Sequence, residues 1–152
     1  MAPELPLRGA CGCGAVQYHV TGQPLMVTMC HCTNCQVRTG SAFSMNMVVR
    51  RQEFSMVRGE TITRALKTGS GKINVQHFCE ACLVRTHTEP RAHAAFVYVR
   101  PGTLEDPRWI VPVAQIWTKS AYPWAMAGAI QCFEENPPDP VALGHAWRDA
   151  NG

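Results

Sequence analysis

The chain has 152 residues, of which 46% are hydrophobic and 16% are charged, and its formal net charge at pH 7 is +3. This length suits a single domain over residues 1–152, and this charge is too small for a dedicated nucleic-acid or membrane-surface binder. We therefore expect no membrane partner and no nucleic-acid partner. The N-terminus lacks the basic segment and apolar stretch of a secretory signal, so a cytoplasmic location is expected.

Short segments that alternate apolar and polar residues recur along the chain, with turn residues between them. In chain order they are Ala15–Val20, Phe43–Val49, Thr61–Lys67, Lys72–Cys79 and Ala95–Arg100. Alternation with a period of two places successive side chains on opposite faces of a strand. The pattern predicts a mainly β domain built from antiparallel sheets.

Two short helices are expected beside these strands. Thr33–Thr39 can form one, with Thr33 or Asn34 as its N-cap, because both side chains can accept a hydrogen bond from a free backbone N–H. Pro140–Arg148 can form the other, directly after a proline pair. Residues 134–152 carry four acidic residues and one arginine, and we expect a mobile acidic C-terminal tail there.

Eight cysteines are the strongest chemical signal in the sequence. Seven of them fall in three tight clusters, which are Cys11 and Cys13, then Cys30, Cys32 and Cys35, then Cys79 and Cys82. Without a secretory signal the thiols are expected to stay reduced, and clusters this tight are typical of metal ligands rather than disulfides. Cys132 stands alone, and we expect it to be a small buried apolar residue.

The number of clustered cysteines favours two zinc sites of different kinds. A structural zinc takes four ligands, whereas a catalytic zinc keeps one position open. Seven cysteines divide into a closed site of Cys11, Cys13, Cys79 and Cys82 and an open site of Cys30, Cys32 and Cys35. A rival division closes the second site with a histidine, and His31, His87 and His93 are the candidates.

Five segments of the chain resemble the glutathione-dependent formaldehyde-activating enzyme family, to which centromere protein V is related. They are Gly9–Tyr18, Cys30–Phe43, Phe78–Cys82, Pro101–Pro107 and Ile116–Trp124. The likeness extends over about residues 7–133. It implies one zinc domain of coiled antiparallel β-sheets. It also implies two zinc ions per chain, a structural one on Cys11, Cys13, Cys79 and Cys82 and a catalytic one on Cys30, Cys32 and Cys35.

The resemblance also implies an activity. The family joins glutathione to formaldehyde, giving S-hydroxymethylglutathione, so we expect a zinc-dependent carbon–sulfur lyase or synthase that acts on glutathione adducts in formaldehyde detoxification. Its partners would be small molecules, namely glutathione and an aldehyde or a related adduct. The alternative is a non-catalytic zinc protein that binds glutathione or a protein partner. The sequence does not indicate an oligomeric state.

Candidate residues for the glutathione pocket follow from their charge and position. Arg38 and Ser41 come just after the Cys30, Cys32 and Cys35 triplet, and a guanidinium group can bind a carboxylate of glutathione. Arg50–Lys72 carries six basic residues against two acidic ones and offers further candidates. Trp117 and Trp124 are considered as pocket walls, and His87 with Glu89 as a base and its orienting partner.

One position departs from the family pattern. Leu83 follows the second cysteine pair, where members of the family commonly carry glycine, which would relax the turn. We expect Leu83 to alter this loop without removing a zinc ligand. The segment Arg85–Pro90 suggests a subgroup with a substrate of its own.

Overall fold

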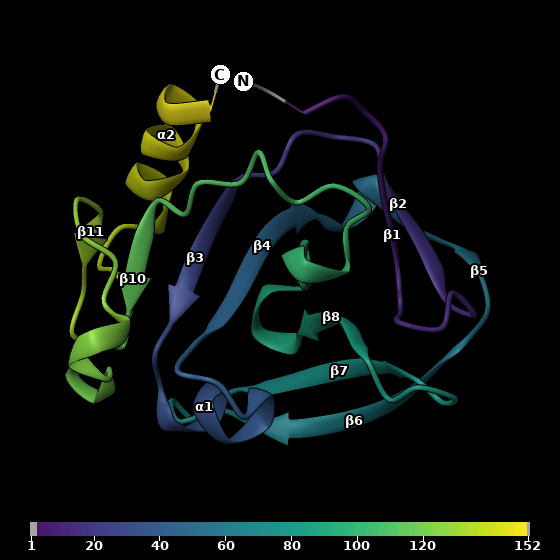
Figure 1. Cartoon of the computed structure of the whole chain (residues 1–152), viewed down its shortest axis with the longest axis horizontal. Coiled ribbons are helices and arrows are strands. Elements are labelled where there is room, and N and C mark those ends of the chain that lie inside the picture. Colours follow the sequence, from purple (N-terminus) through teal and green to yellow (C-terminus); the bar gives the residue numbers. More distant parts are fainter. Residues whose placement is uncertain (1–2, 152) are drawn as a thin grey trace.

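Eleven strands and two α-helices lie within residues 3–151, the part of the chain that the computed structural model describes (Figure 1). The strands are β1 (Leu7–Ala10), β2 (Gln17–Val20), β3 (Met26–Cys30), β4 (Ser44–Arg50), β5 (Phe54–Arg58), β6 (Thr61–Lys67), β7 (Ile73–Cys79), β8 (Arg85–Pro90), β9 (Phe96–Val99), β10 (Ala114–Ile116) and β11 (Gln131–Cys132). The α-helices are α1 (Thr33–Thr39) and α2 (Pro140–Asn151). Five 3₁₀ turns, η1 to η5, cover Arg51–Glu53, Arg91–His93, Pro101–Thr103, Thr118–Ser120 and Pro123–Ala125.

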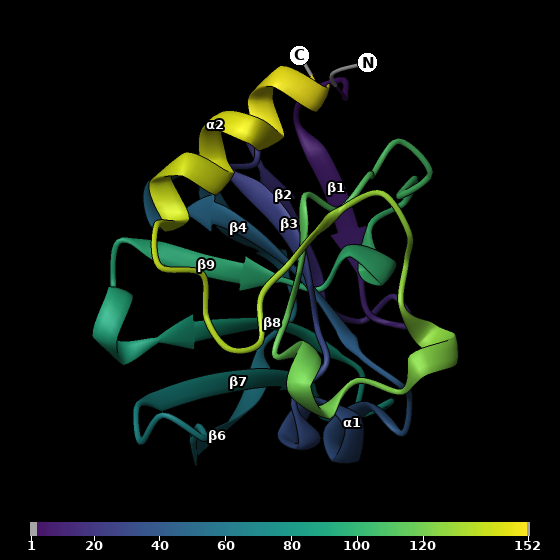
Figure 2. The same ribbon diagram turned by 90° about the vertical axis from the view of Figure 1, so that its left-hand side faces the viewer.

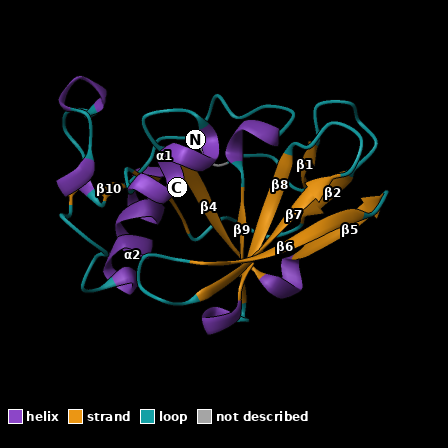
Figure 3. Cartoon of the chain, turned by 90° about the horizontal axis from the view of Figure 1, so that it is seen from below, coloured by secondary structure: helices purple, strands orange, loops and turns teal. Residues whose placement is uncertain are grey.

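The strands form two sheets, as the alternating pattern predicts. The larger sheet has the order β11-β10-β3-β4-β9-β8-β7-β6, and the smaller one has the order β1-β2-β5. All pairs are antiparallel except that β10 lies parallel to both β3 and β11. In Figure 3 the strands fan out, which is the twist expected of sheets built from L-amino acids. The prediction of a mainly β fold is confirmed, with one parallel edge that the sequence pattern did not reveal.

The hydrophobic core lies between one face of the larger sheet and the smaller sheet. Val27, Met47 and Val99 are fully buried on the larger sheet, and Tyr18 stacks on Phe54 with 5.3 Å between their ring centroids on the smaller one. Because successive strand residues point to opposite faces, the residues between those core positions point away from the core. On β3, β4 and β9 they form the floor of a pocket.

Helix α2 packs against both the core and the pocket. Leu143 and Trp147 are buried at 2% and 3% exposure, and Trp147 belongs to the core cluster. In Figure 2 the helix crosses the end of the fold, above β3 and β4. The expected helix is therefore present. Within the expected tail of residues 134–152, Pro140–Asn151 is a helix packed on the core, because the spacing of four residues between Leu143 and Trp147 places both apolar side chains on one helix face.

Two further expectations differ from the structure. Cys132 is exposed on the short edge strand β11, so it is not a buried apolar residue. The N-cap of α1 is Cys32 and not Thr33 or Asn34. No helix within residues 3–151 combines the length and the apolar character that crossing a membrane requires.

Candidate functional site

Four cysteines from distant parts of the chain meet where the two sheets adjoin. Cys11 and Cys13 lie in the turn between β1 and β2, while Cys79 ends β7 and Cys82 lies in the turn before β8. Their sulfur atoms all lie within 4.8 Å of one another. Cys11 Sγ and Cys13 Sγ are 3.6 Å apart, and Cys13 Sγ and Cys79 Sγ are 3.7 Å apart. Tetrahedral zinc with Zn–S bonds of about 2.3 Å requires sulfur separations of about 3.8 Å, so the four thiols fit zinc.

The turn that carries Cys82 holds Leu83 in a left-handed conformation. Its φ is +60°, and its backbone N–H donates to the carbonyl of Cys79 at 2.9 Å. Hydrogen bonds from the backbone N–H groups of Val84 and Cys13 lower the pKa of the Cys82 thiol to about 6, which favours the thiolate that a metal binds. All four ligands are therefore in place with leucine at position 83. Glycine would adopt the same φ there without strain.

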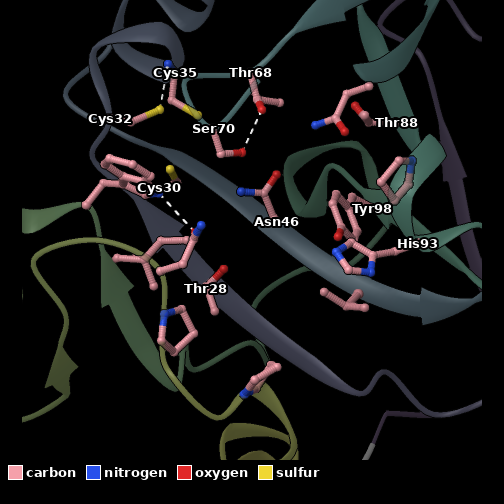
Figure 4. A pocket seen from close by; sticks show the side chains of 18 of the residues that line it. Thr28, Cys30, Cys32, Cys35, Asn46, Thr68, Ser70, Thr88, His93 and Tyr98 are labelled. Atoms are coloured by element: carbon pink, nitrogen blue, oxygen red, sulfur yellow. Dashed lines mark hydrogen bonds between the residues drawn. The ribbon is translucent and has the colours of Figure 1, made fainter. Parts of the chain in front are cut away.

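Three further cysteines converge at the end of β3. Cys30 is the last residue of the strand and is buried, and Cys32 and Cys35 lie at the start of α1. The three sulfur atoms lie within 4.8 Å of one another. Hydrogen bonds from the thiols of Cys30 and Cys35 lower the pKa of Cys32, which makes Cys32 the first of the three to ionise. The donor set of three thiols suits zinc, and Figure 4 shows the three side chains at one end of the pocket.

No histidine or carboxylate within residues 3–151 joins this three-cysteine cluster. His31 is fully buried, and its Nε2 faces Gln115 Oε1 at 3.2 Å. His87 belongs to a different cluster, and His93 lies in the pocket wall outside the cysteine cluster. The rival division of ligands that closes the site with a histidine therefore finds no support in the geometry.

The three cysteines line a cavity of about 870 Å³. Its wall is formed by residues of β3, β4, β7, β8, β9, β10, α1, α2 and of the loops and 3₁₀ turns between them. The described wall includes six Arg or Lys side chains, namely Arg38, Lys72, Arg85, Arg100, Lys119 and Arg148, and no Asp or Glu. A cavity lined by charges of one sign concentrates ligands of the opposite sign. The arrangement favours an anionic ligand.

Arg38, Arg85 and Arg100 form a cationic group beside the three cysteines. Arg100 Nη1 donates to the carbonyl of Met45 at 3.1 Å and to Asn46 Oδ1 at 2.8 Å, and its buried Nε has no partner. Burial lowers the pKa of Arg100 to about 9, and the charge of Arg85 adds to this effect. In the described part of the chain, none of the three arginines forms an ion pair with a carboxylate. Ionisation of Cys35 or Cys30 acts in the opposite direction and raises the pKa of Arg100.

The candidates named from the sequence divide into two groups. Arg38 and Trp117 line the cavity, and so does Lys72 from the basic segment 50–72. Ser41 is exposed just beyond α1 and lies outside the cavity wall, as does Trp124, which is 80% exposed. Arg85 and Arg100 were not named as pocket residues from the sequence, although Arg85 begins the segment Arg85–Pro90 that suggested a substrate of its own and Arg100 ends the expected strand Ala95–Arg100.

His87 and Glu89 meet His77 in a separate cluster. The rings of His77 and His87 stack with 4.1 Å between their centroids, and His77 Nε2 lies 3.3 Å from Glu89 Oε2. Arg51 Nη1 contacts the same carboxylate at 2.8 Å. His77, His87 and Glu89 do not line the cavity. The geometry therefore gives no support to His87 as a base that Glu89 orients toward a substrate in the cavity.

Comparison with known families agrees with this geometry. Residues 6–120 match the family described as glutathione-dependent formaldehyde-activating enzyme. The chain belongs to this family. The match includes all seven clustered cysteines and the arginines Arg38, Arg85 and Arg100, and it ends before α2.

A solved structure supports the fold of this family member. The crystal structure of a Rhodobacter sphaeroides protein, determined in a structural genomics project, superposes with a TM-score of 0.52 at 22% sequence identity. The superposition covers 82% of this chain and 98% of that one. No curated protein sequence matches the chain significantly.

Proposed function

We propose that this member of the glutathione-dependent formaldehyde-activating family is a zinc-dependent carbon–sulfur lyase or synthase that acts on glutathione adducts. The observation that carries the proposal is the three-cysteine cluster, which has no fourth protein ligand within residues 3–151 and opens into a cavity with cationic walls. In this proposal Cys30, Cys32 and Cys35 hold the catalytic zinc, and Cys11, Cys13, Cys79 and Cys82 hold a structural zinc.

The charges of the pocket match those of glutathione. Its two carboxylates and one ammonium group give the tripeptide a net charge of −1, which becomes −2 when its thiol is ionised. Arg38, Arg85 and Arg100 can bind the carboxylates as forked guanidinium–carboxylate pairs. Fixing the tripeptide at two points holds its sulfur beside the cysteine cluster, and this replaces an encounter in solution with a positioned one.

The family reaction is the addition of a thiol to an aldehyde. The glutathione sulfur forms a bond to the carbonyl carbon, the carbonyl π electrons move to oxygen, and the thiol proton ends on that oxygen, which gives S-hydroxymethylglutathione from formaldehyde. Zinc, when bound, supplies a cation that stabilises a thiolate at neutral pH. The cationic wall assists by lowering the cost of bringing a second negative charge to a site already rich in thiolates. In the reverse direction the same arrangement releases aldehyde and glutathione.

The reduced state of the thiols fits a cytoplasmic location, which we include in the proposal. All eight cysteines are free in the structure. A reducing compartment favours metal-binding thiols, since oxidation would convert neighbouring thiols into disulfides.

The test starts with the zinc content of the purified chain and its binding of glutathione, measured by elemental analysis and calorimetry. We expect two zinc ions per chain and saturable glutathione binding. Formation of S-hydroxymethylglutathione from ¹³C-formaldehyde is then followed by exchange NMR, against the uncatalysed rate. Cys35→Ser should abolish catalysis and leave the chain folded.

The alternative is a non-catalytic zinc protein that binds glutathione or a protein partner. It differs in one outcome, namely glutathione binding without acceleration of the reaction with any aldehyde. Full activity of Cys35→Ser would contradict the assignment of the catalytic site. Two zinc ions without any glutathione binding would contradict the proposed substrate.

A further inference from the structure

The cavity is larger than the family reaction requires. Its volume of about 870 Å³ lies near the upper end of the roughly 300–1,000 Å³ typical of pockets for drug-sized ligands. Formaldehyde adds only one carbon and one oxygen to glutathione. The side chains that line the rest of the cavity therefore indicate what else it can hold.

The pocket floor changes from polar to apolar along the strands. On β3 the residues that point into the cavity are Cys30, then Thr28, then Met26, and on β4 Asn46 pairs with Thr28 while Val48 pairs with Met26. Two residues of a strand span about 6.7 Å, so the row that begins at Met26 lies about 13 Å from Cys30. The floor thus passes from thiols through polar side chains to an apolar row.

The cationic group lies in a different direction from the apolar row. β3 and β9 are both antiparallel to β4, so they run in the same direction. Cys30 at the end of β3 and Arg100 just after β9 therefore lie where these strands end. β8 is antiparallel to β9, so Arg85 at its start lies at the same ends of the strands. Arg85 and Arg100 therefore lie across the strands from Cys30, while the apolar row lies along β3 and β4.

Helix α2 and β9 complete the apolar end. Val141 and Pro140 of α2 line it together with Met26, Val48 and Phe96. The helix passes close over the start of β3, where a Cβ atom on Gly144 would lie 3.6 Å from the carbonyl oxygen of Leu25. Figure 4 shows Tyr98 and His93 at the end of the pocket away from the cysteines. His145 and Arg148 stand at the outer rim, exposed, and contact each other at 3.0 Å.

We infer that the substrate is a glutathione adduct whose sulfur carries a large apolar group, with its peptide carboxylates at Arg38, Arg85 and Arg100 and its apolar group between β3, β4 and α2. This inference rests on the proposed function and specifies its substrate class. The apolar end owes part of its wall to α2, which lies beyond the residues that match the family. The reaction is the same addition of sulfur to a carbonyl carbon, with an apolar aldehyde in place of formaldehyde.

The experiment is calorimetric titration of the zinc-loaded chain with glutathione and with its S-methyl, S-propyl and S-hexyl derivatives. Each buried methylene should tighten binding by about fourfold, so the S-hexyl derivative, which has five more methylenes than the S-methyl derivative, should bind on the order of 1,000-fold more tightly. Glutathione and S-methylglutathione report on the proposed function alone. The increase along the series reports on the apolar end.

Two variants of one residue localise the effect. Val48→Phe fills the apolar end, and Val48→Thr makes it polar at nearly constant shape, so both should reduce the increase along the series by at least tenfold. The matched control is Val57→Thr, at an exposed valine of β5 outside the cavity. Thermal unfolding checks that each variant is folded.

The outcomes separate the two proposals. A flat series in a chain that binds glutathione overturns the inference and leaves the proposed function standing. No binding of any member of the series overturns the proposed function, and the inference falls with it. Tighter binding of an S-(5-carboxypentyl) derivative than of S-hexylglutathione also overturns the inference, because the far end would then be an anion site formed by His145 and Arg148.

Discussion

Cys32 Sγ accepts a hydrogen bond at 3.3 Å from the backbone N–H of Cys35, so one candidate zinc ligand also caps the helix that carries another. A thiolate accepts such a bond better than a thiol does, and the N-terminus of a helix favours negative charge. Local folding and metal binding are therefore coupled at this point of the chain. Substitution can separate the two roles of Cys32, because serine is a good N-cap and a poor zinc ligand.

Cys32→Ser and Cys32→Ala form a matched pair that tests this coupling. Both should reduce the zinc content from two ions per chain to one, measured by elemental analysis. Serine retains the cap, whereas alanine should cost about a further 1 kcal/mol of unfolding free energy in urea titrations. Equal stability of the two variants would show that the cap contributes nothing.

Leu83→Gly should stabilise the chain. Leu83 is 67% exposed and has a φ of +60°, so the substitution relieves backbone strain while removing little packing. A left-handed conformation costs an L-residue roughly 1–2 kcal/mol, and we expect a gain of about 1 kcal/mol after the added entropy of glycine in the unfolded chain. Leu83→Ala is the control, because it shortens the side chain and keeps the strain. A gain from alanine as large as that from glycine would contradict the explanation.

Two tryptophans test whether α2 is an integral part of the fold. Trp147 is 3% exposed within the core cluster, and Trp147→Ala should cost about 3–5 kcal/mol of unfolding free energy. Trp124 is 80% exposed, and Trp124→Ala should change stability by about 0.5 kcal/mol or less. Similar small effects of both substitutions would mean that the C-terminal segment is not packed on the core.

His87 should make stability depend on pH. Burial, with help from the charges of His77 and Arg51, lowers the pKa of His87 from 6.5 to about 3. Between these values the unfolded chain binds a proton that the folded chain does not, so the unfolding free energy falls as pH drops below about 6.5. The steepest slope from this one group is about 1.4 kcal/mol per pH unit.

Loss of zinc at low pH would also lower the stability, and a substitution at His87 separates the two effects. His87→Gln should flatten the pH dependence of stability in urea titrations between pH 7 and pH 5, relative to the unmodified chain. His93→Gln, at an exposed position, should leave the slope unchanged. The same slope in the His87 variant as in the unmodified chain would assign the acid sensitivity to other groups.

Arg100→Gln should weaken glutathione binding. The substitution removes a cation beside the three cysteines and retains a polar amide. Hydrogen bonds to charged groups contribute about 1.5–3 kcal/mol, so we expect a loss of roughly 10- to 100-fold in affinity by calorimetry. Arg64→Gln is the control, because Arg64 is exposed and lies outside the cavity. Equal binding by both variants would remove Arg100 from the ligand site.

Local patterns in the sequence were sufficient to predict the cysteine clusters and several of the strands and helices. The spacing of the cysteines indicated which side chains can bind metal, because a turn brings together residues two or three positions apart whatever the rest of the chain does. Alternation identified strands such as Thr61–Lys67, and the segment Thr33–Thr39 is helical as expected. These features depend on neighbours along the chain.

The pocket, by contrast, was decided by the tertiary structure. Arg38 follows Cys35 in α1, but Arg85 starts β8 and Arg100 follows β9, and only the order of strands in the sheet places these two arginines beside Cys35. The short strands β10 and β11 contain three and two residues, too few to show a period, and their parallel pairing depends on contacts with β3. Helix α2 packs because Leu143 and Trp147 meet a core formed by distant strands. The sequence by itself determined which cysteines can bind metal, and the fold decided which charges and which apolar surface surround them, because those contacts join residues far apart in the chain.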